Sequence, residues 1–265
     1  MHQLTEKEKL AREKLCIPLD VSSTRDAMAI VDNLEGYAKT FKIGQQLYRN
    51  SYAEGINIFR WLKHRNLQSF EDLKYGDKDD QNYEAVKGAT KYGVDFLTVH
   101  ASFGYGIIKS VVRGAEDGAN ENNVNKPKVL AVTVLTSLDQ NTLNKQLRMP
   151  GSVEERVLLY AKIAENAGAD GIVCSAGEIP VLKQNLLRGM IYATPGISTE
   201  QGFAAHDQKR VYTAGQAVKN GASLVIVGTA ITKIMDLDFG ETVQAAPLQM
   251  QENAYKILQA MAKHL

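Results

Sequence analysis

Residues 70–77 read Phe70-Glu71-Asp72-Leu73-Lys74-Tyr75-Gly76-Asp77, which is typical of a strand that ends in a charged loop. Side chains alternate between the two faces of a strand, so Asp72 and Lys74 should share a face, with Asp77 following in the loop. A helix-like run, residues 81–92, comes next. The stretch is therefore one strand–helix unit with charges at its junction. Such a cluster is either a solvated surface group or an active site, because perturbed ionisable groups gather at strand ends.

The same unit recurs along the chain. Short apolar runs predict strands at residues 15–20, 40–44, 69–74, 96–100, 129–133, 171–174, 191–195 and 224–228. Amphipathic segments between them predict helices, among them residues 25–34, 56–65, 153–167 and 213–220, and several end in glycine. Eight strands alternating with helices in 265 residues predict a single (β/α)8 TIM barrel, an α/β fold. We expect one domain over residues 1–265, with residues 1–14 as an N-terminal helical extension and residues 119–126 as a polar loop.

Composition narrows the class of protein. Hydrophobic residues make up 44% of the chain and charged residues 23%, as in ordinary globular domains. The net charge is +1 without a basic block, so neither nucleic acid nor a membrane surface is an expected partner. The chain has no apolar run long enough for a membrane span and no signal-peptide pattern, so we expect a cytoplasmic protein. Cys16 and Cys174 lie in apolar runs and are predicted to be buried free thiols.

In such a barrel, function belongs at the carboxyl ends of the strands. The polar residues expected there are Asp20, Lys42, Asp72, Lys74, Asp77, His100, Thr136, Ser137, Ser175, Ser198, Gln208 and Thr229. Lysines and carboxylates thus converge from the first three strands. The sequence has no His, Cys and carboxylate set at metal-ligand spacing and no Gly-x-Ser-x-Gly elbow, so neither a catalytic zinc nor a serine nucleophile is expected. This pattern favours proton chemistry on a polar small molecule.

These residues resemble the orotidine 5'-phosphate decarboxylase family. The family motif Asp-Leu-Lys-x-x-Asp is similar to residues 72–77, and its strand-one and strand-two signatures are similar to residues 16–20 and 41–44. Further segments continue the likeness in family order: residues 99–101, 132–137, 171–176, 194–197 and 207–210. The likeness therefore extends over nearly the whole chain.

The resemblance implies decarboxylation of orotidine 5'-monophosphate to UMP without a metal or cofactor. It implies that Lys42, Asp72, Lys74 and Asp77 form a charged catalytic network, that Lys74 protonates C6, and that Asp77 serves the neighbouring site of a homodimer. The substrate-binding residues that it implies are Asp20, Lys78, Gln81, Thr136, Ser198, Gln208, Gly228 and Thr229.

Four of these positions depart from the family pattern. Lys78 and Gln81 stand where the family usually has isoleucine and threonine. Ser198 and Thr229 replace the two arginines that bind the substrate phosphate in the family. Each lost guanidinium removes charge-assisted hydrogen bonds, worth about 1.5–3 kcal/mol each.

Two alternatives follow from these departures. One is a paralogue of the same superfamily with other chemistry, such as decarboxylation or isomerisation of a sugar phosphate, but such paralogues usually carry an acidic residue where Lys42 stands. A variant of this alternative is a divergent paralogue that acts on a different or unphosphorylated nucleotide-like substrate. The other is a non-catalytic nucleotide-binding barrel. The retained charged residues argue against it, because an idle buried charge network costs stability.

Overall fold

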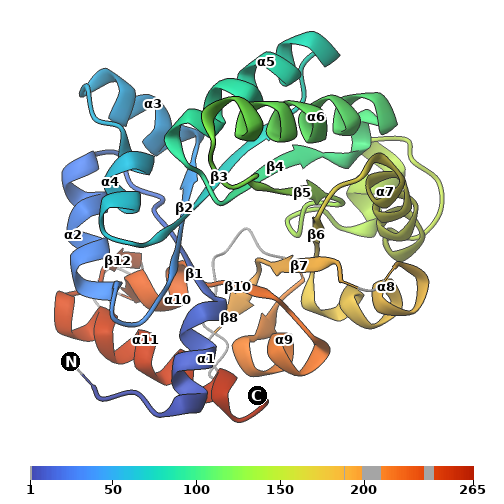
Figure 1. Ribbon diagram of the computed structural model, residues 1–265. Helices are drawn as coiled ribbons and strands as arrows, with labels where there is room; N and C mark the ends of the chain where they lie inside the picture. Colours follow the sequence, from blue (N-terminus) through green and yellow to red (C-terminus); the bar gives the residue numbers. More distant parts are fainter. Residues whose placement is uncertain (1, 188, 199–209, 236–241) are drawn as a thin grey trace.

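In a computed structural model, the chain closes eight parallel strands into a barrel (Figure 1). The structure describes residues 2–187, 189–198, 210–235 and 242–265. The barrel strands are β1 (Leu15–Pro18), β2 (Thr40–Gly44), β3 (Gln68–Tyr75), β4 (Phe96–His100), β5 (Lys128–Val132), β6 (Gly171–Val173), β7 (Ile191–Thr194) and β10 (Leu224–Ile226). Each strand pairs with its neighbour in chain order, and β10 closes the ring against β1. The TIM-barrel prediction is confirmed, and each of the eight strands falls on a predicted one.

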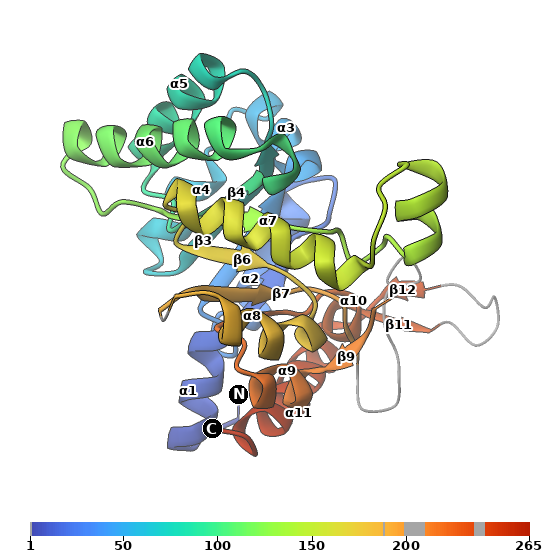
Figure 2. The ribbon, with the colours of Figure 1, turned by 90° about the vertical axis from the view of Figure 1, so that its right-hand side faces the viewer.

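Helices form the outer layer around this barrel (Figures 1 and 2). They are α1 (Glu6–Lys14), α2 (Thr24–Leu34), α3 (Gln45–Ala53), α4 (Ile58–His64), α5 (Asp79–Ala89), α6 (Tyr105–Asn122), α7 (Val153–Ala167), α8 (Ile179–Asn185), α9 (Ala214–Asn220), α10 (Thr229–Thr232) and α11 (Pro247–Ala262). Local sequence sets their ends. For example, a Ser152–Glu155 capping box starts α7, and Gly168, with φ of 89°, ends it. No helix in the described ranges is both long and apolar enough to cross a membrane.

Two short strand pairs lie at the carboxyl-terminal end of the barrel. β8 (Ile197–Ser198) pairs with β9 (Tyr212–Thr213), and β11 (Lys233–Met235) pairs with β12 (Thr242–Gln244). Both pairs lie beyond the carboxyl ends of the last barrel strands, and Figure 2 shows β9, β11 and β12 projecting from that side. They therefore border the mouth of the barrel.

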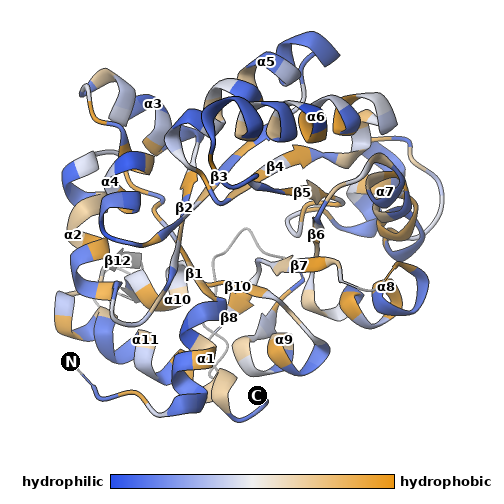
Figure 3. Ribbon diagram, viewed as in Figure 1, coloured by the Kyte–Doolittle hydropathy of each residue, from blue (hydrophilic) through white to orange (hydrophobic). Residues whose placement is uncertain are grey.

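The apolar core has two parts. The larger part lies between the strands and the surrounding helices, and Figure 3 shows the apolar strands enclosed by helices with hydrophilic outer faces. The smaller part packs inside the barrel and contains Cys16, Phe70, Leu130, Ala193, Leu224 and Ile226. Both cysteines are free and buried, as the sequence predicted. Side chains therefore fill the barrel interior, and the cavity lies above them, at the mouth of the barrel.

The expected polar loop over residues 119–126 is partly wrong, because α6 continues to Asn122. The two long helices α5 and α6 pack closely at small residues of α6. A Cβ atom on Gly118 would lie only 2.5 Å from Thr90 Oγ1, and one on Gly114 would lie 2.5 Å from the Tyr83 carbonyl oxygen. Residues 119–126 are polar and rich in asparagine, a poor helix former, so the sequence indicated a loop; close packing of α6 stabilises the helix as far as Asn122.

Candidate active site

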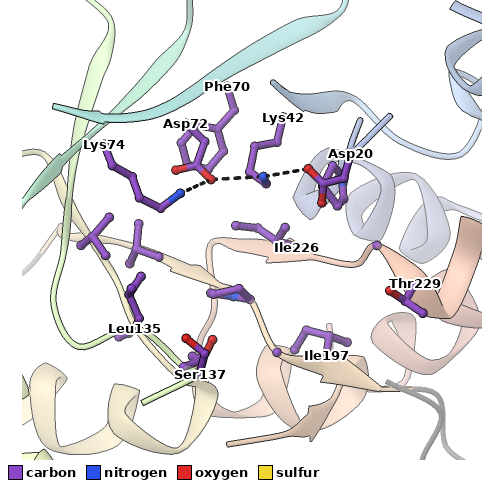
Figure 4. Close-up of a pocket in the computed structure, with 18 of the residues that line it drawn as sticks. Asp20, Lys42, Phe70, Asp72, Lys74, Leu135, Ser137, Ile197, Ile226 and Thr229 are labelled. Carbon is purple, nitrogen blue, oxygen red and sulfur yellow. Dashed lines mark ion pairs between the residues drawn. The ribbon is translucent and has the colours of Figure 1, made fainter. Parts of the chain in front are cut away.

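A cavity of about 350 Å³ opens at the carboxyl ends of the barrel strands (Figure 4). Its lining residues come from most of the strands and the loops that follow them: Pro18, Asp20, Lys42, Phe70, Asp72, Lys74, Val132, Val134, Leu135, Thr136, Ser137, Val173, Cys174, Pro195, Gly196, Ile197, Ile226, Gly228 and Thr229. This is the position of the active site in (β/α)8 enzymes. Among the described residues, no three His, Cys, Asp or Glu side chains gather closely enough to hold a metal ion.

Charged side chains line one wall of the cavity. Lys74 Nζ lies 2.9 Å from Asp72 Oδ2, and Lys42 Nζ lies 3.1 Å from the same oxygen. Asp20 Oδ1 is 3.6 Å from Lys42 Nζ at the more open end of the row. Figure 4 shows the four side chains in sequence along the wall, with the two ammonium groups on either side of Asp72. The site therefore presents a buried carboxylate between two cations.

Mutual electrostatic interactions favour the charged forms of Lys42 and Asp72. Burial disfavours the ammonium of Lys42, but the charges of Asp72 and Asp20 outweigh this effect and raise its pKa. Burial likewise disfavours the Asp72 carboxylate, but Lys42 and Lys74 lower its pKa. Only 12% of each of the Lys42 and Asp72 side chains is exposed, so each buried charge is stabilised by its partner and would be costly without it.

The opposite side of the cavity is formed by the segment after β5. Val134, Leu135, Thr136 and Ser137 contribute apolar surface and hydroxyl groups to the lining. Arg210 supports this segment from behind: its guanidinium donates hydrogen bonds to the carbonyl oxygens of Val134 (2.8 Å) and Leu135 (3.0 Å) and pairs with Glu178. The sequence places Arg210 in the family-like segment over residues 207–210 but does not predict its contact with this wall.

Comparisons with known proteins agree with this architecture. A family model described as "Orotidine 5'-phosphate decarboxylase / HUMPS family" matches residues 13–237. A protein from Nostoc sp. named orotidine 5'-phosphate decarboxylase is 35% identical over 223 residues, 84% of this chain and 92% of the relative. This chain belongs to the orotidine 5'-phosphate decarboxylase / HUMPS family.

Other family members extend the match. A relative of the same name from Heliobacterium modesticaldum is 32% identical over 96% of this chain and 98% of its own length. The crystal structure of orotidine 5'-phosphate decarboxylase from Lactobacillus acidophilus superposes with a TM-score of 0.75 at 27% identity, covering 94% of this chain and 99% of that one. The family resemblance inferred from the motifs is therefore confirmed over the whole barrel.

The structure brings together many of the residues that the family resemblance singles out. The predicted residues that line the cavity are Asp20, Lys42, Asp72, Lys74, Thr136, Gly228 and Thr229. Ser198 is buried on β8 but does not belong to this lining, although the neighbouring Ile197 does. Gln208 lies outside the described residues.

Three predicted residues lie away from the cavity. Asp77 and Lys78 form the exposed loop after β3, and Gln81 is exposed in the first turn of α5. The side chain of Asp77 accepts a hydrogen bond from the Lys78 amide, 2.7 Å away. None of the three lines the cavity of its own chain. If these three residues take part in catalysis, they therefore act outside the cavity of their own chain.

A buried acid behind the site was not singled out from the sequence. Glu71 precedes Asp72 on β3 and is only 2% exposed. Burial raises the pKa of Glu71 from 4.5 to about 7, and a hydrogen bond from Tyr75 Oη, 3.3 Å away, offsets part of the rise. An acidic residue inside an apolar strand was a signal that could have identified it, because carboxylates are rarely buried without partners.

We expect Glu71 to make stability depend on pH. The folded-state pKa lies above the unfolded value, so the native state binds the proton more tightly. The stabilisation is complete below pH 4.5 and is lost as the pH rises towards about 7. Replacing Glu71→Gln should remove this loss, so its stability relative to wild type should rise by about 2–3 kcal/mol between pH 5 and pH 8. Urea unfolding at both pH values measures the difference.

The matched control is Glu116→Gln, because Glu116 is exposed on α6. Its stability relative to wild type should stay constant between the two pH values. A constant difference for Glu71→Gln as well would show that Glu71 titrates as it does in the unfolded chain.

Proposed function

We propose that this chain decarboxylates orotidine 5'-monophosphate to UMP, a step of pyrimidine biosynthesis. The observation that carries the proposal is the row Lys42–Asp72–Lys74 in the wall of the barrel cavity, with 2.9 and 3.1 Å contacts to one carboxylate oxygen. The names of the relatives from Nostoc sp. and Heliobacterium modesticaldum support the same reaction. The reaction class is that of a carboxy-lyase.

The chemistry requires what this row offers. Loss of carbon dioxide from C6 of the pyrimidine leaves a carbanion with little delocalisation, so the transition state needs a nearby cation. An ammonium that is already held in place stabilises this charge as it develops and costs little reorganisation. In the proposal, Lys74 supplies that charge and then donates a proton to C6. Asp72 holds Lys74 and lies beside the departing carboxylate.

The remaining lining residues fit the other parts of the nucleotide. Asp20 lies at the open end of the row, next to Lys42, and we assign both residues to the ribose hydroxyls. We assign Thr136, which lines the opposite wall of the cavity, to the pyrimidine edge. Gly228 and Thr229 line the end of the cavity that we assign to the phosphate, and Ser198 and Gln208 are further candidates for phosphate binding.

We also propose a homodimer with shared sites. Asp77, Lys78 and Gln81 are exposed and lie outside the cavity of their own chain. These residues follow the carboxyl end of β3, which is the end of the strand that faces the barrel mouth. A second copy that packs its own mouth against this loop would therefore have the three residues close to its own cavity. A two-fold axis would make the exchange reciprocal. In this arrangement Asp77 completes the catalytic network of the partner.

The test of the reaction follows the ultraviolet absorbance of orotidine 5'-monophosphate as it is converted to UMP. Steady turnover that produces UMP supports the proposal. Tight binding of UMP without turnover would favour a non-catalytic nucleotide-binding barrel. Equal affinity for UMP and uridine would show that the protein does not recognise the phosphate, and the proposed substrate would then be wrong.

The phosphate end supports a separate prediction. Thr229→Arg places a guanidinium where the cavity lining faces the proposed phosphate. A charge-assisted pair should tighten UMP binding by about 10- to 100-fold, leave uridine binding unchanged and keep turnover equal or higher. Calorimetric titration of wild type and variant with both ligands measures this.

Thr229→Gln is the control, since it adds a long polar side chain without the charge. It should leave UMP affinity near the wild-type value. Weaker UMP binding by Thr229→Arg would mean that another substrate group occupies this end of the cavity, and would favour the divergent-substrate alternative.

A further inference from the structure

The strand that carries Asp72 and Lys74 is irregular at these two residues. In the parallel ladder between β3 and β4, Glu71 pairs with Leu97 and Tyr75 pairs with Val99. Residues 72–74 of β3 therefore stand opposite a single residue of β4, Thr98. A regular strand would place one residue there. The chain thus bulges where its catalytic side chains are attached, and a bulge redirects the side chains of a strand.

Lys74 has an unusual backbone conformation within this bulge. Its φ is 54°, in the left-handed region that residues other than glycine rarely adopt. Its amide meets a side chain of β4, from the residue that faces the bulge. The Lys74 N–H donates to Thr98 Oγ1 at 3.0 Å. The strained residue is therefore anchored by one hydroxyl group.

The same hydroxyl also binds the central carboxylate. Thr98 Oγ1 donates to Asp72 Oδ1 at 3.0 Å, and this hydrogen bond is buried. A hydroxyl has one proton, so accepting the Lys74 N–H leaves that proton for Asp72. Oδ1 is thus held by Thr98, while Oδ2 faces both ammonium groups. Rotation of the Asp72 carboxylate would break this bond and move Oδ2 away from the lysines.

We infer that Thr98 is a positioning residue for the reaction: its hydroxyl sets the orientation of the Asp72 carboxylate and the backbone of Lys74. Thr98 is fully buried and does not line the cavity, so it acts through these two residues and does not touch substrate. The kinetic part of this inference rests on the proposed decarboxylation.

The test compares Thr98→Val with Thr98→Ser. Valine keeps the shape of threonine but has no hydroxyl, whereas serine keeps the hydroxyl. With orotidine 5'-monophosphate, kcat of Thr98→Val should fall by about 10- to 100-fold while KM changes less than about threefold, because misplacing a catalytic group affects mainly the transition state. Thr98→Ser should recover kcat to within about threefold of wild type.

Thr40→Val is the matched control. Thr40 is a fully buried strand threonine on β2, and its hydroxyl donates to Gln68 Oε1 at 3.0 Å, away from the charged row. It should lose a similar amount of stability in urea unfolding but keep its kcat. An unchanged kcat in Thr98→Val, or no recovery in Thr98→Ser, overturns the inference.

A crystal structure of Thr98→Val separates this inference from the proposed function. We expect Lys74 to leave the left-handed region and the Asp72 carboxylate to rotate away from at least one lysine. If wild type fails to decarboxylate the nucleotide, the proposed function fails, but this structural outcome still decides the role of Thr98. Unchanged geometry at Asp72 and Lys74 overturns the inference whatever the activity.

Discussion

Lys74→Ala should lower kcat for orotidine 5'-monophosphate by at least about four orders of magnitude. In the proposed mechanism, the substitution removes both the cation that stabilises the developing carbanion and the proton donor for C6. The fold should persist, because Asp72 keeps its 3.1 Å contact with Lys42 and its hydrogen bond from Thr98. A discontinuous assay of released carbon dioxide measures the activity, and circular dichroism with urea unfolding tests whether the fold persists.

Lys219→Ala is the control for this prediction, because Lys219 is exposed on α9, on the outer layer of the barrel. It should retain wild-type kinetics. If Lys74→Ala keeps more than about a tenth of wild-type turnover, Lys74 is not the proton donor and the proposed mechanism is wrong.

Mixing two inactive proteins, Lys74→Ala and Asp77→Asn, should restore about a quarter of wild-type activity. Random exchange of subunits makes half of the dimers hybrid, and each hybrid has one site with both residues intact if Asp77 serves the partner's site. The exposed position of Asp77 outside its own cavity is the reason for this expectation. Activity measured against mixing ratio, with exchange verified by two affinity tags, gives the result.

The control mixture is Lys74→Ala with Asp72→Asn. These residues touch within one chain, 2.9 Å apart, so no hybrid contains an intact site and activity should stay at background. If the Asp77→Asn mixture also stays at background after complete exchange, or if the protein is monomeric at micromolar concentration, the sites are not shared.

Local sequence determined the fold and the identity of the charged row. The alternation of apolar runs with amphipathic segments predicted eight strands, and parallel strands bring their carboxyl ends to one mouth. Spacing along β3 predicted that Asp72 and Lys74 lie near each other, and their side chains do meet, but through a bulge that regular strand alternation does not predict. These predictions succeeded because they depend on periodicity and on short-range connections.

The tertiary structure decided what depends on contacts between distant segments. Thr98 meets Asp72 and Lys74 only because β4 pairs with β3 out of register, and residue spacing within β3 contains no sign of that bulge. Arg210 reaches the wall after β5 only once the barrel has closed, 75 residues along the chain from Leu135. The pKa of Glu71 likewise depends on the helices that cover β3, because burial in low dielectric, and not the neighbouring sequence, raises it.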